Sequence, residues 1–375
     1  MNPIISTIDL LKLASGDFLS LQVYRFIGAN PGKKVYLQAN LHGSEIVGNE
    51  VIHQLIQFLI ALDSEQIKGE ICLVPVCNPL GTNQRNHFFS TGRFNSYDGK
   101  DWNRIFWDYE KEAEDLGFLA KSYLKLNPKE IEKRYFQEIK KAFIQQKEAL
   151  ATAKSAPYNK HYRYQLQSLC LDANYVIDIH SSSNQGIDYI YCFQTREESA
   201  KYFLLDRGIL MTKYDGDAFD EAFMKPWLAL ERELAKLGKK IKFPRESWTL
   251  ELGSGMSMNP ESISKGVKGI KNYLVAKGII ELENYNLDST KIKLVQKNKI
   301  ARYYAPTGGM IRNRVSLGSN VSAGEKIYQI LSFNKKGELP TVTDILAMQD
   351  GLVFDSSTNQ TVNQGEYVLS IMNDE

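Results

Sequence analysis

The sequence lacks the long apolar stretch that a membrane-spanning helix needs. Among its 375 residues, no segment approaches the roughly 20 consecutive apolar side chains of such a helix. Residues 1–16 also lack the basic segment and apolar run of a secretory signal peptide. We therefore expect a cytoplasmic protein with no membrane partner.

Cysteine is scarce, and no two cysteines stand in a Cys-x-x-Cys pair. Cys72, Cys77, Cys170 and Cys192 each lie in an apolar, strand-like segment. This pattern is typical of buried free thiols rather than of a disulfide framework or a thiolate metal site. The reducing cytoplasm fits such cysteine usage.

An excess of either charge is also missing. The chain has 46 basic and 44 acidic side chains, a formal net charge of +2. This near-balance gives no reason to expect nucleic acid as a partner. With 43% hydrophobic and 24% charged residues, the composition is that of an ordinary globular protein. The length suits one large domain with a smaller one.

Strand-like and helical patterns alternate over the first two-thirds of the chain. Apolar residues recur at helical spacing over 45–62, 218–237 and 260–277. The β-rich or apolar segments are 19–27, 34–41, 70–76, 174–179, 189–193 and 248–252. This alternation predicts an α/β fold in which helices cover a sheet.

Residues 105–160 interrupt this alternation. They are rich in Glu, Lys, Tyr and Gln and have helical periodicity with few β-branched residues. We interpret them as a helical insertion into the α/β domain. A solvated surface hairpin is the favoured interpretation, with a lid or a dimer contact as the alternative.

The chain changes to short β-segments and glycine turns from about residue 288. A weak internal repeat aligns 309–311 with 351–353 and 321–327 with 362–368, at offsets of 42 and 41 residues. This duplication resembles the barrel-sandwich fold of biotinyl and lipoyl domains. The segment 331–335 does not match their carrier-lysine hairpin, so we expect the fold without the carrier function.

The first chemical motif is a histidine and a glutamate three residues apart. His42 and Glu45 follow a predicted strand and stand at the entrance to a predicted helix. Ligands of open α/β sheets collect at the carboxyl ends of strands, so both side chains could reach one ion. Gly43 between them allows a sharp turn of the backbone.

A third candidate ligand ends another apolar strand. His180 closes the segment 176–180, and Asp178 precedes it by two residues. Two histidines and one glutamate with an open fourth position are typical of catalytic zinc sites. Asp178 either orients the imidazole from behind or is a buried polar residue satisfied elsewhere.

Two further motifs contain charged side chains that could act beside an ion held by His42, Glu45 and His180. Arg93 and the run from Asp101 to Arg104 offer guanidinium groups that bind carboxylates or hold a developing oxyanion. Glu251 interrupts an apolar strand, where an unpaired carboxylate is costly. A carboxylate beside a zinc-bound water could act as a general base.

Taken in order, these motifs resemble those of the zinc carboxypeptidases. The matching motifs are His42-x-x-Glu45, Asn78-Pro79-x-Gly81, Arg93, Asp101-x-Asn103-Arg104, Asp178-x-His180 and Thr249-x-Glu251. Within that superfamily the chain looks most like the succinylglutamate desuccinylase/aspartoacylase family. Two features indicate this family. They are the small domain that follows Glu251 and the amino-acid sequence of residues 92–94 and 102–106. The resemblance covers roughly residues 34–280 and extends to the C-terminal domain.

The resemblance implies a fold and a domain organisation. A mixed open sheet flanked by helices would form a zinc-dependent catalytic domain over 1–287, with the helical insertion at about 105–160. A smaller all-β barrel-sandwich domain would follow over 288–375.

The resemblance also implies a role for each motif. One Zn²⁺ per chain would be held by His42, Glu45 and His180. Arg93, or Arg85 as its alternative, would polarise the scissile carbonyl, and Glu251 would act as general base and then as general acid. Asn103 and Arg104 would bind the carboxylate of the amino-acid product.

The implied activity is hydrolysis of the amide bond of a small N-acyl amino acid. A metallocarboxypeptidase that removes C-terminal residues from peptides would use the same residues and is the alternative. The third hypothesis is a non-catalytic binding protein. Such relatives usually lose a metal ligand or the catalytic glutamate, and this sequence keeps all three candidate ligands and Glu251. The sequence does not identify the acyl group, the amino acid or the substrate-side tyrosine. The oligomeric state also stays open, and a homo-oligomer is one possibility. Arg196 and Arg245 are candidates for recognising an acidic substrate.

Overall fold

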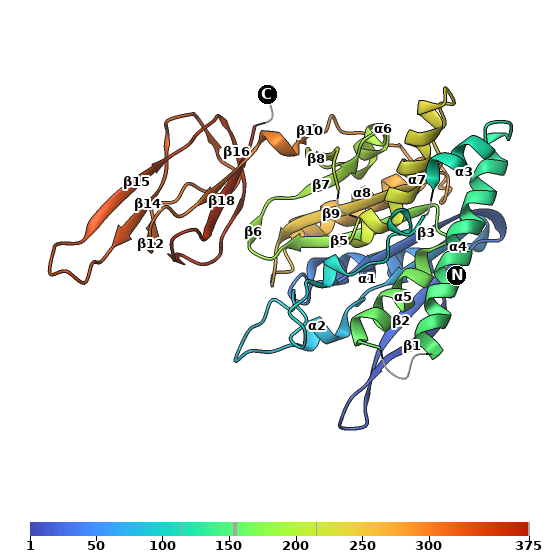
Figure 1. Ribbon diagram of the computed structural model, residues 1–375, viewed down its shortest axis with the longest axis horizontal. Helices are drawn as coiled ribbons and strands as arrows, with labels where there is room; N and C mark the ends of the chain where they lie inside the picture. The colour runs from blue at the N-terminus through green and yellow to red at the C-terminus, as the bar shows by residue number, and fades with distance from the viewer. Residues whose placement is uncertain (114, 153–155, 215, 374–375) are drawn as a thin grey trace.

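The computed structural model describes residues 1–113, 115–152, 156–214 and 216–373. Figure 1 shows a broad part that contains a large sheet and its helices, and a narrow part made of β-strands that projects to one side. We refer to residues 300–372, which form the strands of the narrow part, as the C-terminal part.

The broad part is built on a nine-stranded mixed sheet. In spatial order its strands are β1 (Ile4–Lys12), β2 (Phe18–Ile27), β4 (Lys68–Val74), β3 (Asn30–Ala39), β5 (Tyr175–Ser182), β9 (Glu246–Ser254), β7 (Tyr189–Phe193), β8 (Arg207–Met211) and β10 (Lys293–Gln296). The predicted mixed α/β sheet flanked by helices is confirmed. The sequence analysis missed β1, β8 and β10, and β10 pairs with β8 although it lies beyond residue 287. The domain boundary at 287 stays a prediction.

Long helices cover both faces of this sheet. On one face lie α1 (Val47–Ile60) and α8 (Pro260–Ala276), and on the other lie α5 (Tyr158–Cys170) and α7 (Phe219–Lys236). Neighbouring residues of a strand point to opposite faces. Leu37 therefore packs under α1 and α8, whereas Tyr36 packs on the opposite face against Phe219.

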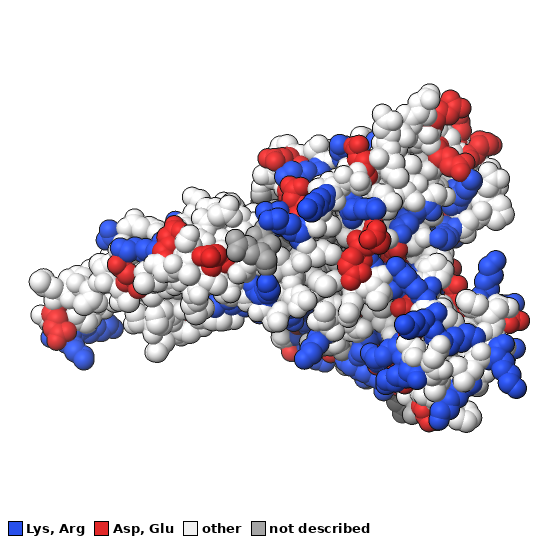
Figure 2. Space-filling model, turned by 90° about the horizontal axis from the view of Figure 1, so that it is seen from above, with Lys and Arg blue, Asp and Glu red and all other residues white. Residues whose placement is uncertain are grey.

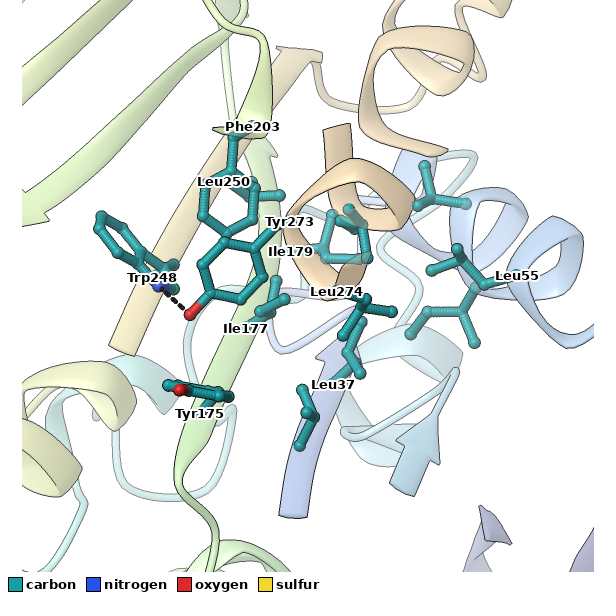
Figure 3. Close-up of a cluster of buried hydrophobic side chains, with 14 of the residues drawn as sticks. Leu37, Leu55, Tyr175, Ile177, Ile179, Phe203, Trp248, Leu250, Tyr273 and Leu274 are labelled. Atoms are coloured by element: carbon teal, nitrogen blue, oxygen red, sulfur yellow. Dashed lines mark hydrogen bonds between the residues drawn. The ribbon is translucent and has the colours of Figure 1, made fainter. Parts of the chain in front are cut away.

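Aromatic rings fill the core beneath α8. Figure 3 shows Phe203, Trp248 and Tyr273 packed beside the aliphatic residues of β3 and β5. The rings of Phe203 and Tyr273 stack with centroids 4.3 Å apart, and Trp248 Nε1 donates a hydrogen bond of 3.0 Å to the Tyr273 hydroxyl. Such ring pairs add about 0.5–1.5 kcal/mol beyond their buried area, so they strengthen the packing of α8 on β9.

In its described residues, the predicted helical insertion contains α3 (Leu116–Ser122) and α4 (Pro128–Thr152), and α5 begins at its end. Residues 114 and 153–155 of this prediction lie outside the described residues. Every fourth residue of α4, from Ile131 through Tyr135 and Ile139 to Phe143, is buried in one cluster. The Tyr135 hydroxyl donates to the Pro226 carbonyl of α7 at 3.0 Å. The insertion thus has a buried face and is anchored to the α/β domain.

Two sheets form the C-terminal part. One contains β11 (Ile300–Tyr304), β18 (Tyr367–Met372), β16 (Gly351–Ser356) and β13 (Asn320–Val321), and it also pairs with β6 (Gln185–Gly186) of the broad part. The other contains β15 (Thr341–Leu346), β14 (Lys326–Ser332), β12 (Gly309–Arg312) and β17 (Thr361–Val362). Residues of both sheets share one buried core. The finer assignment of a barrel-sandwich stays a prediction.

The internal repeat corresponds to an exchange of short strands. The first copy contains β12, β13 and β14, and the second contains β16, β17 and β18. β13 of the first copy pairs with β16 of the second, while β17 of the second pairs with β12 of the first. Each copy therefore contributes to both sheets.

The remaining elements are short. They are the helices α2 (Pro79–Asn83) and α6 (Glu197–Ala200) and 3-10 turns at Ser64–Gln66, Trp102–Arg104, Tyr109–Lys111, Lys201–Phe203 and Lys297–Lys299. None of the helices in the described part of the chain combines the length and apolar character that crossing a membrane requires. Figure 2 shows basic and acidic side chains on both parts of the molecule, in keeping with the small net charge. All four cysteines are buried and free, as predicted.

Candidate active site

Three neighbouring parallel strands bring the predicted site residues to one edge of the sheet. β3, β5 and β9 lie side by side, and the turn after β3 carries His42 and Glu45. His180 and Glu251 are direct partners in the register of β5 and β9. Residues 135 and 71 positions apart in the chain therefore meet because their strands end together.

The turn after β3 depends on close backbone packing. A Cβ atom on Gly43 would lie 2.1 Å from the Gly81 carbonyl oxygen, so no larger residue fits there. Asn78 caps α2 and donates through Nδ2 to the Leu41 carbonyl at 2.7 Å. The Asn78-Pro79-x-Gly81 motif thus supports the turn that presents His42 and Glu45.

The three predicted metal ligands converge on one point. Their ligand atoms lie within 4.8 Å of one another, and all three residues are buried. His42 Nδ1 lies 2.8 Å from Glu45 Oε1, and His180 Nδ1 lies 2.7 Å from Glu45 Oε2. Burial alone would raise the pKa of Glu45, but the two histidines bring it well below its ordinary value. The carboxylate is therefore ionised and faces two imidazoles.

A second carboxylate lies behind each imidazole. His42 Nε2 is 3.1 Å from Asp101 Oδ1, and His180 Nε2 is 3.0 Å from Asp178 Oδ2. Partners of this kind orient the ring so that the other nitrogen faces the metal. The sequence analysis considered this role for Asp178 and missed it for Asp101, although Asp101 belongs to a motif it singled out.

Arg93 lies at the edge of the ligand cluster. The loop that carries it is held to the turn after β3 by a hydrogen bond from Ser44 N to the Thr91 carbonyl at 2.9 Å. Arg93 Nε lies 3.0 Å from Asp101 Oδ2, and Nη1 lies 3.8 Å from Glu45 Oε1. Arg85, the alternative, donates to the carbonyls of Thr82 and Gln84 and does not line the cavity.

Asn103 and Arg104 lie beside the same space. Asn103 Oδ1 accepts a hydrogen bond of 2.8 Å from the backbone N–H of Phe219, which fixes the amide group. Arg104 is exposed, and its Nη1 donates to the Asn103 carbonyl at 2.6 Å. Both side chains line the cavity, so they are placed where a substrate carboxylate could bind.

Glu251 has an unsatisfied oxygen in this cavity. Its Oε2 is buried and has no hydrogen-bond partner among the described residues. Burial raises the pKa of Glu251 to about 7, and the carboxylate of Glu45 contributes in the same direction. A carboxyl group with a pKa near neutrality can both accept and donate a proton.

The cavity has a volume of about 540 Å³ and extends beyond the predicted residues. Its further wall comes from the C-terminal part and includes Arg302, Tyr304, Phe354, Asp355 and Tyr367. The sequence analysis missed these residues because no local motif marks them.

Two other candidates from the sequence lie elsewhere. Arg196 is fully buried and pairs with Glu231 at 2.6 Å, and Arg245 pairs with Glu132 at 3.2 Å. Neither lines the cavity. Both guanidinium groups are used in structural ion pairs, so neither of these two candidates is placed to recognise an acidic substrate.

Comparisons with known proteins agree on one family. Residues 31–207 match the model of the Succinylglutamate desuccinylase/Aspartoacylase catalytic domain. A curated relative, N-alpha-acetyl-L-2,4-diaminobutyric acid deacetylase of Halomonas elongata, is 27% identical over 174 residues. That match covers 46% of this chain and 46% of the relative, so the chain spans about half of the relative's length.

Two solved structures resemble the whole chain. A protein of Shewanella frigidimarina, named as a succinylglutamate desuccinylase/aspartoacylase, is 26% identical with a TM-score of 0.87, over 100% of this chain and 98% of its own. A family protein of Shewanella amazonensis is 27% identical with a TM-score of 0.87, over 99% and 98%. On this evidence residues 31–207 match the catalytic domain of the succinylglutamate desuccinylase/aspartoacylase family, and the whole chain is similar in fold to proteins named for that family.

Proposed function

We propose that this protein is a zinc-dependent hydrolase that cleaves the amide bond of a small N-acyl amino acid. The proposal rests on one observation. The ligand atoms of His42, Glu45 and His180 converge in the same cavity that contains the buried Glu251 Oε2, which has no hydrogen-bond partner among the described residues. The name of the Halomonas relative, a deacetylase of an N-acetylated amino acid, supports the same reaction class.

The donor set of the site fits zinc. Two neutral imidazole nitrogens and one carboxylate are a common catalytic set for this ion, and His42, Glu45 and His180 would hold it. The carboxylates of Asp101 and Asp178 would keep both Nδ1 atoms turned toward it. Bound zinc would supply Lewis-acid chemistry toward a water molecule and an acyl carbonyl.

The protein's own side chains would divide the remaining tasks. Glu251 would take the proton of the attacking water at Oε2 and pass it to the leaving amine. Arg93 would donate to the acyl oxygen as negative charge develops there. Asn103, whose Oδ1 is already used, would offer its Nδ2 together with the Arg104 guanidinium to the substrate carboxylate.

The size of the cavity supports a small substrate. A volume of about 540 Å³ lies within the range of roughly 300–1,000 Å³ for small-molecule sites. The C-terminal part closes one side of this space, which limits room for a long peptide. A carboxypeptidase activity would use the same residues, so it is an outcome of the test.

The test is hydrolysis of a mixed panel by zinc-loaded protein, read by mass spectrometry. The panel holds N-acyl amino acids and short peptides, and Glu251→Gln serves as the blank. We expect free amino acid from small N-acyl compounds and a loss of about 10²–10⁴-fold in kcat for Glu251→Gln, with zinc retained. Sequential loss of C-terminal residues from peptides would establish the carboxypeptidase instead. Full activity of Glu251→Gln would overturn the mechanism.

A further inference from the structure

The C-terminal part is joined to the site by a two-stranded seam. β6 begins three residues after the end of β5, the strand that carries His180, and pairs antiparallel with β16. Asp355 lies opposite Gly186 in this register, and Ile187 N donates to the Phe354 carbonyl at 3.0 Å. Figure 1 shows β6 where the broad part meets the narrow part.

Asp355 holds the end of β5 across this seam. Its Oδ2 accepts a hydrogen bond from the Ser182 hydroxyl, and its Oδ1 accepts one of 2.5 Å from the Tyr367 hydroxyl. The Tyr367 oxygen lies 2.9 Å from Ser370 Oγ. Hydrogen bonds to a carboxylate are roughly twice as strong as neutral ones, so Ser182 is tied to two strands of the C-terminal part.

The segment after β5 is folded tightly around this contact. A Cβ atom on Gly186 would lie 2.8 Å from Ser182 Cβ and 3.7 Å from Asp355 Oδ2. The backbone N–H of Asn184 donates to Ser182 Oγ at 3.1 Å. Little freedom is left to residues 182–186 while Asp355 is in place.

Ser183, the next residue after Ser182, contacts the candidate metal ligand Glu45 and also Arg93. Ser183 Oγ donates to Glu45 Oε1 at 3.0 Å and accepts from Arg93 Nη1 at 3.1 Å. Ser183 therefore links a candidate metal ligand with the candidate oxyanion donor. The position of its hydroxyl depends on the segment that Asp355 fixes through Ser182.

We propose that Asp355 is a positioning residue of the active site. By holding Ser182 it places Ser183, and Ser183 sets the orientation of Glu45 and Arg93. The inference rests on the proposed function, since it assigns Glu45 to the metal and Arg93 to the substrate. It means that the C-terminal part organises the metal site as well as closing the cavity.

The variant Asp355→Ala tests the proposal. Its zinc affinity is measured by chelator competition, and its kcat and KM are each compared with those of the wild type. Outer partners of a metal site are worth about 10–100-fold in metal affinity or activity. We expect losses of that size in zinc affinity and kcat, with KM changed less than threefold. Asp355→Asn, which keeps one acceptor, should recover part of the loss.

A double-mutant cycle separates positioning from general destabilisation. Ser183→Ala should give a similar loss, and combining it with Asp355→Ala should add little, because both act through one contact. Ser356→Ala is the matched control, since its hydroxyl contacts Gln185 in the same seam at 3.5 Å and does not line the cavity. It should keep the zinc affinity and kcat of the wild type. If Asp355→Ala does not fold, Ser182→Ala removes the same hydrogen bond from the other side.

The outcomes are distinct from those of the proposed function. Failure of the wild-type protein to bind zinc would overturn the proposed function. A wild-type protein that binds zinc, with Asp355→Ala equal to it in zinc affinity and kcat, would overturn the positioning role alone. Additive losses in the cycle, or an equal loss in Ser356→Ala, would also overturn it.

Discussion

Asp220 shows at the scale of one residue how burial sets protonation. It lies at the start of α7 and lines the cavity. Burial, with the charge of Glu221 in the same direction, raises the pKa of Asp220 to about 7, although a hydrogen bond with Thr249 lowers it. The folded protein therefore holds a proton that the unfolded chain releases near pH 4.

Asp220→Asn should remove a pH-dependent cost to stability. For a carboxyl whose folded pKa is raised, the cost is absent below the unfolded pKa and grows as pH rises toward the folded pKa. The variant should gain up to roughly 4 kcal/mol over the wild type at pH 8 and almost nothing at pH 4. Urea denaturation at both pH values measures this. An equal difference between the two proteins at pH 4 and pH 8 would contradict it.

Residue chemistry explains what could be predicted of the site. His180 and Glu251 stand out because each interrupts or ends an apolar strand, and His42 and Glu45 stand out because they follow one at the entrance to a helix. The structure brings these four together, while their roles stay predictions. Asp355 gives no such signal, since it meets Ser182 from 173 residues away and only the closed fold brings the two side chains into contact.

At the scale of the element, periodicity predicted the long helices and most strands of the large sheet, but it missed the nine-residue edge strand β1 and the shortest strands. The helix expected over 218–237 is α7 (Phe219–Lys236), because its apolar residues recur every three or four positions. β6 has two residues and no pattern of its own, so its pairing with β16 could not be predicted. The fold-defining elements are therefore readable from the sequence, and the seam that completes the site is not.

The buried stripe of α4 leads to a prediction about stability. Phe143 is buried, and its ring centroid lies 5.4 Å from that of Trp107 and 5.2 Å from that of Tyr164. Phe143→Ala should lower the free energy of unfolding by about 3–5 kcal/mol through loss of packing. It should leave kcat unchanged, since no described residue of α4 lines the cavity.

The next residue of the helix is the control. Ile144 is 41% exposed, so Ile144→Ala should change the free energy of unfolding by less than about 0.5 kcal/mol. Denaturant titration of both variants measures the difference. A changed kcat in Phe143→Ala would instead favour the earlier alternative that this insertion acts as a lid.

At the scale of the whole molecule, the cavity wall is shared by distant parts of the chain and carries unpaired positive charge. Lys213, Lys297 and Arg302 line it, and none has a carboxylate within ion-pair distance among the described residues. Charges around a cleft attract ligands of opposite sign over about one Debye length. Carboxylates such as Glu221 and Asp355 line the same cavity, but on the side where these three cations lie we expect the local field to favour a second negative charge on the substrate.

Arg302→Ala should therefore raise KM for N-acyl amino acids that carry a second carboxylate. We expect about a fivefold to tenfold rise for these substrates, a smaller rise for singly charged ones, and little change in kcat, because Arg302 does not contact the candidate metal ligands. Arg312→Ala is the control, since Arg312 is also exposed in the C-terminal part but does not line the cavity. Equal effects on both substrate classes, or no effect at all, would refute the prediction. Added salt should weaken the wild-type preference.

Because β13 and β17 are exchanged between the two repeats, the sheets of the C-terminal part can be completed only after the second repeat has been synthesised. Neither repeat can complete its own sheet, since each short strand pairs with the other copy. The helices around the large sheet can form while the ribosome is still producing the second repeat. Tyr367 and its strand β18 are synthesised after every candidate metal ligand, so a nascent chain that already contains those ligands still lacks part of the cavity wall. A chain truncated before residue 367 would contain every candidate metal ligand but lack the strand whose Tyr367 hydroxyl secures Asp355.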